Sequence, residues 1–100
     1  MAMLLELPKE MTIAETGTLW TRFKAALLSG DEVLLDGRGV AHVDIAGLQL
    51  IEVAWSVATA RGSLLSFAPN GRSPVLEQAA VDAGLCCARV GGVWAEAEHG

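Results

Sequence analysis

Three short apolar runs alternate along this 100-residue chain with three longer segments in which apolar side chains recur at helical spacing. The runs that predict strands are residues 3–7, 33–35 and 63–67. The segments that predict helices are residues 13–29, 46–61 and 74–83. The alternation of strands with helices favours parallel pairing, because two parallel strands need a crossover and a helix supplies one. We therefore expect an α/β domain in which a parallel or mixed sheet of four to five strands packs with three to four helices.

Residues that cap helices stand where the three expected helices begin. Thr12 and Glu15 form a capping box before the first helix. Asp44 is the natural N-cap of the second helix, and Ser73 caps the third. The second helix is apolar around most of its circumference, so we expect it to need more cover than one sheet face provides.

The length predicts a single domain over residues 1–100, with a core at about 4–87 and a short acidic tail at 88–100 that holds an edge strand at 88–90. Hydrophobic residues make up 52% of the chain, which excludes a disordered protein. The net charge of −5 argues against nucleic acid and anionic lipid as partners, because both attract positive charge. No apolar run approaches the roughly 20 residues of a membrane span, and residues 1–5 are too short for a secretory signal. We expect a cytoplasmic protein without direct membrane insertion.

Motifs that carry catalysis are absent from the sequence: there is no nucleophile elbow, no phosphate-binding glycine loop that ends in Lys-Ser or Lys-Thr, and no His-Glu-x-x-His. Adjacent Cys86 and Cys87 predict two buried free thiols, since neighbouring residues rarely form a disulfide. His42 and His99 lack ligand spacing to each other or to this pair, so no zinc site is expected. We expect neither an enzyme nor a bound cofactor or metal.

Two aspartates are compatible with a different function, that of a domain that binds a phosphoryl group or a metal ion. Asp36 and Asp44 are expected at or beyond the carboxyl ends of strands, where open α/β sheets bind ligands. Paired carboxylates at such a place are an alternative that indicates a small phosphoacceptor or metal-binding domain. Against it, no third acid and no phosphate-binding lysine stand nearby in the sequence. His42 is more simply interpreted as a hydrogen-bonded loop residue than as an acid or base.

The sequence around the start of the second expected helix reads His42-Val43-Asp44-Ile45-Ala46-Gly47-Leu48-Gln49-Leu50-Ile51. It resembles the signature of STAS domains, the family of anti-sigma factor antagonists and sulphate-transporter tails. In that family an apolar residue and Asp precede a Ser or Thr, a small residue, Gly-Leu and an apolar helix. The similarity extends to residues 33–36 as the central strand, 61–62 as the helix end and 75–85 as the last helix. It covers roughly residues 4–87.

The resemblance implies a non-catalytic domain that binds a partner protein and releases it when the hydroxyl residue after the Asp is phosphorylated. A phosphate adds about −1.5 to −2 charges at a helix N-terminus inside the contact. Ile45 stands at that position, and neither it nor Ala46 carries a hydroxyl. The sequence therefore predicts a bacterial signalling module, similar to an anti-sigma factor antagonist in the regulation of transcription but without its phosphorylation switch. The alternatives are a permanent STAS subunit of a chemotaxis cluster or of a phospholipid-transport ABC system.

The expected partner-binding surface is the loop 38–44 together with the start of the second helix. Its residues are Arg38, His42, Asp44, Ile45, Ala46, Gly47 and Gln49. Exposure of the aliphatic Ile45 favours a protein partner, either an anti-sigma factor or kinase-like protein or a transporter or chemotaxis component, and a homodimer stays open. We expect the rings of Trp20 and Trp55 in the core, and that of Trp94 exposed or in an interface.

Overall fold

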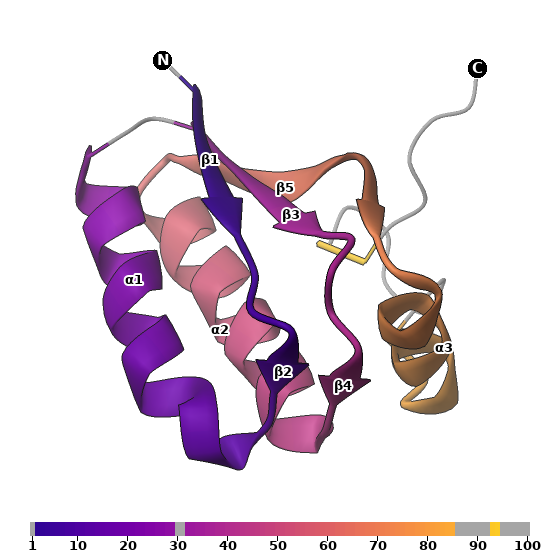
Figure 1. Cartoon of the computed structure of the whole chain (residues 1–100). Coiled ribbons are helices and arrows are strands. Elements are labelled where there is room, and N and C mark those ends of the chain that lie inside the picture. Colours follow the sequence, from indigo (N-terminus) through magenta and orange to yellow (C-terminus); the bar gives the residue numbers. More distant parts are fainter. Residues whose placement is uncertain (1, 30–31, 86–92, 95–100) are drawn as a thin grey trace.

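The computed structural model describes residues 2–29, 32–85 and 93–94, and it confirms the α/β class (Figure 1). The strands are β1 (Ala2–Glu6), β2 (Glu10–Met11), β3 (Glu32–Gly37), β4 (His42–Val43) and β5 (Leu64–Arg72). The helices are α1 (Thr16–Ser29), α2 (Ile45–Ala60) and α3 (Pro74–Asp82), and a 3-10 turn, η1 (Ile13–Glu15), precedes α1. The predicted helices are therefore confirmed to within a few residues at their ends. The tail strand at 88–90 and the residues Cys86, Cys87 and His99 lie outside the described residues.

The strands form two parallel sheets instead of the single sheet that we expected. β1, β3 and β5 form one sheet in that order, with Leu5 opposite Leu35 and Leu35 opposite Phe67. Beyond the carboxyl ends of β1 and β3, the chain pairs again as the short sheet β2-β4 (Figure 1). Pro8 separates β1 from β2 and has no N–H for a ladder, which explains why the pairing is interrupted.

Both α1 and α2 cover the same face of the three-stranded sheet and lie side by side on it (Figure 1). The core forms between these layers. Its fully buried side chains include Phe23, Val33, Leu35 and Ile51. Most of the additional apolar residues of α2, such as Trp55, are half-buried against this core. The second helix therefore finds part of the cover that it needs on α1 as well as on the sheet.

The prediction that the ring of Trp94 is exposed or in an interface was wrong. Its side chain is 1% exposed, and its ring lies 5.3 Å from that of Phe67. The Arg72 guanidinium stands 5.4 Å from the centre of the Phe67 ring and donates to the carbonyl of Trp94 at 3.4 Å. Val93 is buried as well. A large ring and its neighbour from the acidic tail are thus part of the core, because burial of an aromatic side chain outweighs the polar character of the residues that follow it.

β5 continues through the turn-forming residues Pro69-Asn70-Gly71 to Arg72. The ladder shifts register there, because Leu35 lies opposite Phe67 whereas Gly37 lies opposite Arg72. Asn70 adopts a positive φ of 57° within this bulge. Turn residues therefore bend the strand without ending it.

Among the described residues, no helix is both long and apolar enough to span a membrane.

Candidate functional site

Asp44 lies at the centre of the expected partner-binding surface and caps α2 as predicted. Its Oδ1 accepts a hydrogen bond from the N–H of Gly47 at 3.0 Å. Its Oδ2 accepts from the N–H of Ile13 at 3.0 Å, so the same carboxylate also satisfies the first residue of η1. One side chain therefore holds the starts of two helical segments together.

The capping box before η1 is confirmed. The N–H and the hydroxyl of Thr12 both donate to the Glu15 carboxylate, at 3.1 Å for the N–H. The N–H of Glu15 in turn donates to the carbonyl of Thr12 at 2.9 Å. These bonds orient the backbone of Ile13 so that its N–H faces Asp44.

The small sheet β2-β4 supports the site through contacts with the residues at the start of α2. Lys9 accepts at its carbonyl from the N–H groups of Ala41 and His42, and Met11 accepts from that of Asp44 at 3.3 Å. Gly47 packs directly on this sheet: a Cβ at that position would lie 2.2 Å from the carbonyl oxygen of Met11. Gly47 is buried, so it brings α2 close to β2 and presents no side chain to a partner.

Two exposed isoleucines flank Asp44. Ile45 is 57% exposed, as the sequence predicted. Ile13 is 72% exposed, although its place in the helical apolar pattern suggested an inward side chain. We call these two residues the Ile13–Ile45 patch. Ile13 joins the site only through contact with Asp44, 31 positions later in the chain, so no local sequence signal indicates it.

The remaining predicted site residues differ in how exposed their side chains are. His42 and Gln49 are exposed, and Ala46 is half-buried. Arg38 extends into solvent but is bound to Asp36, with its Nε 3.0 Å from Oδ1 and a terminal nitrogen 2.9 Å from Oδ2. That bidentate pair shapes the turn after β3.

Hydrogen bonding lowers the pKa of both aspartates. At Asp36 the Arg38 side chain is the largest cause, and its backbone N–H adds to the effect. At Asp44 the N–H of Gly47 is the largest cause, followed by that of Ile13. Both groups are therefore charged at neutral pH and already accept hydrogen bonds within the fold.

The arrangement gives little support to a metal centre. In the part of the chain that the structure describes, no three His, Cys, Asp or Glu side chains gather as ligands. Asp36 is bound to a guanidinium, and both oxygens of Asp44 accept backbone N–H groups. What this site offers chemically is a rigid surface that carries one carboxylate and two aliphatic side chains.

No protein-family profile, curated protein or solved structure matches the chain. The similarity to STAS domains thus rests on residues 42–51 and their flanks, and it stays a prediction.

Proposed function

We propose that this domain is a non-catalytic protein-recognition module of bacterial signalling that binds its partner through the Ile13–Ile45 patch and the adjoining loop 38–44. The observation that carries the proposal is the pair of exposed isoleucines held on either side of Asp44. Exposed β-branched side chains gain free energy when a partner covers them. The function is therefore assigned to a surface and not to a reaction.

Rigidity of this surface supports a docking role. Asp44 ties the residue before one helix to the start of another segment, and Gly47 locks α2 against Met11. A surface that is already ordered loses less conformational entropy on binding, so more of its contact energy appears as affinity.

The chemistry of the surface favours a protein over other partners. A chain with a net charge of −5 lacks the positive field that draws nucleic acid or anionic lipid. The exposed aliphatic side chains of Ile13 and Ile45, together with exposed His42 and Gln49, give this surface the mixture of apolar and polar groups that protein interfaces have.

The binding that we propose is not switched at Ile45. Neither Ile45 nor Ala46 has a hydroxyl that a kinase could modify. Two hydroxyls stand near other helix starts. That of Ser73 is buried and donates to the carbonyl of Val40 at 2.7 Å, and that of Thr12 donates to the Glu15 carboxylate. The proposal is a constitutive contact, as in an antagonist-like regulator that has lost its switch or in a permanent subunit of a chemotaxis or phospholipid-transport assembly.

A site-specific cross-linking experiment tests the surface. A photoreactive amino acid is placed at Ile45 and, as the matched control, at Val53, an aliphatic residue of the same helix that is 49% exposed. In the native host we expect one partner to be cross-linked from position 45, to be lost on Ile13→Asp, and to be absent from position 53. Equal capture at both positions, or capture unaffected by Ile13→Asp, contradicts the proposal.

A further inference from the structure

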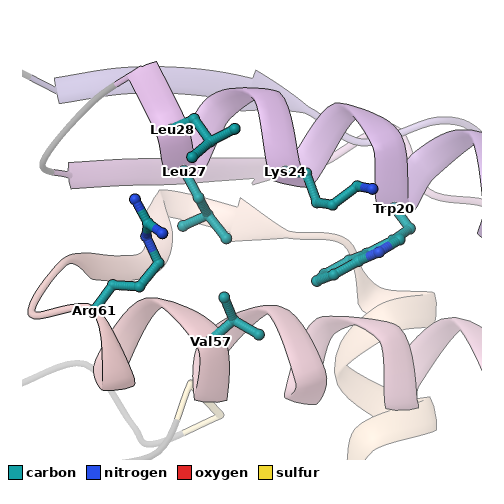
Figure 2. A pocket seen from close by; sticks show the side chains of 6 residues that line it. All are labelled: Trp20, Lys24, Leu27, Leu28, Val57 and Arg61. Atoms are coloured by element: carbon teal, nitrogen blue, oxygen red, sulfur yellow. The ribbon is translucent and has the colours of Figure 1, made fainter.

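A second surface lies between α1 and the carboxyl-terminal part of α2, whereas the Ile13–Ile45 patch lies where the helical segments begin. Here the two helices leave an open groove of about 160 Å³. Its lining residues are Trp20, Lys24, Leu27, Leu28, Val57 and Arg61 (Figure 2). The groove shares no residue with the proposed partner-binding surface.

The floor and walls of the groove are apolar. Leu27 is buried at its base, and Leu28 is 71% exposed. The Trp20 ring projects from α1 into the space between the helices, and Val57 points toward the same space from α2 (Figure 2). Water in such a groove meets few polar partners, so an apolar group that displaces it gains free energy.

Positive charge borders this apolar space from both helices. Lys24 belongs to α1, and Arg61 directly follows α2. Among the described residues neither is ion-paired, whereas Arg38 and Arg72 are bound to carboxylates. The groove of a chain with a net charge of −5 is thus bordered by two cationic side chains.

We propose that the groove binds a small amphipathic carboxylate, with an apolar body the size of one aromatic ring or a medium-length alkyl chain. Its carboxylate lies in the positive potential of Lys24 and Arg61, whose charged groups stand at opposite ends of the groove (Figure 2). The volume supports a small molecule, because apolar cavities of roughly 150 Å³ hold a ligand of benzene size. A partner helix docks with several anchors along a much longer groove. The two cations select an anionic ligand over a neutral one by charge complementarity.

Octanoate is a suitable probe, with octan-1-ol and octylamine as neutral and cationic analogues of the same chain length. Titration of the isotope-labelled full chain is followed by NMR. We expect saturable octanoate-induced shifts at the Trp20 indole N–H and at backbone amides around Val57, at concentrations of about 1 mM or below. Octanol binding should be at least about fivefold weaker, and octylamine should not bind.

Charge reversal separates this site from non-specific association. Lys24→Glu and Arg61→Glu should each weaken octanoate binding about fivefold to tenfold. Lys9→Glu is the matched control, because Lys9 is also exposed but lies outside the groove, and it should leave the affinity unchanged. Val57→Trp, which fills the groove, should abolish the shifts. Equal affinity for octanoate and octanol, equal effects of Lys9→Glu and Lys24→Glu, or no saturable binding overturns the proposal.

Discussion

The Asp44 carboxylate and the backbone N–H of Ile13 lie 3.0 Å apart although 31 positions separate the two residues in the chain. Because Asp44 also accepts from Gly47, this bond couples the start of α2 to η1 and, through it, to α1. The bond brings the backbone of Ile13 next to the residue that precedes Ile45. The geometry of the proposed docking surface therefore depends on the Asp44 side chain, together with the contact of Gly47 with Met11.

Replacement of Asp44 by alanine should destabilise the fold through the loss of both hydrogen bonds. We expect Asp44→Ala to lower the Tm by about 5 °C, the usual size of a lost helix cap in a domain of this length. Asp44→Asn keeps an oxygen for Gly47 but presents an amide group to Ile13, so its Tm should lie between those of the wild type and Asp44→Ala. Thermal unfolding followed by circular dichroism measures both. An asparagine variant as stable as the wild type contradicts a role for the bond to Ile13, and equal Tm values for the alanine and asparagine variants contradict a role for the bond to Gly47.

The contact of Gly47 with β2 allows no side chain. A Cβ there would lie 2.2 Å from the Met11 carbonyl oxygen, so Gly47→Ala must displace the start of α2 and should cost about 3 kcal/mol. Gly17 in α1 is the matched control, since a Cβ at that position meets nothing within 4 Å. Gly17→Ala should leave stability unchanged or raise it by about 0.5 kcal/mol. Urea unfolding of the two variants tests the contrast, and a similar cost for both refutes it.

Acid should weaken the fold through Asp36 and Asp44. Hydrogen bonds hold the pKa of each folded carboxyl below its ordinary value. Their stabilisation is therefore fully present above the unfolded pKa of about 3.9 and is lost as the pH falls through the folded pKa. We expect the Tm to decline below about pH 4. The double variant Asp36→Asn, Asp44→Asn should show a shallower decline in the same thermal scans, and an unchanged slope argues against this origin.

Ile45 should contribute to binding without contributing to folding. Its side chain is 57% exposed at the first position of α2. We expect Ile45→Asp to change the free energy of unfolding by less than about 0.5 kcal/mol, because it removes few buried contacts and places a negative charge at the favourable end of the helix dipole. Calorimetry checks this value. A large loss of stability would show that Ile45 supports the fold and not a partner contact.

Trp94 should behave as a core residue despite its position near the acidic end of the chain. The ring is 1% exposed and contacts Phe67. Trp94→Ala should cost about 3 kcal/mol or more, as for other buried aromatic residues. Trp20→Ala is the comparison, and it should cost clearly less because Trp20 is only half-buried. Denaturant unfolding measures both, and a cost at Trp94 no larger than at Trp20 would show that its burial contributes little.

Local signals account for what the sequence predicted well. The helix around residues 45–60 begins at Asp44 and ends near Gly62 because a capping carboxylate and a left-handed glycine act within a few residues of themselves. Strands alternating with such helices settle the α/β class, since crossover geometry leaves few other arrangements. The exposure of Ile45 was expected from the position that the resemblance to STAS domains gives it, and its side chain is 57% exposed.

Long-range packing accounts for the features that the sequence did not reveal. Four features depend on contacts between residues distant in sequence. They are the division into two sheets, the bulge of β5 at Asn70, the bond between Asp44 and Ile13, and the burial of Trp94. Caps and periodicity act over one or two turns of chain and carry no information about which distant surfaces meet. These tertiary contacts depend on how well side chains from different layers fill the core, so only the tertiary structure determines them.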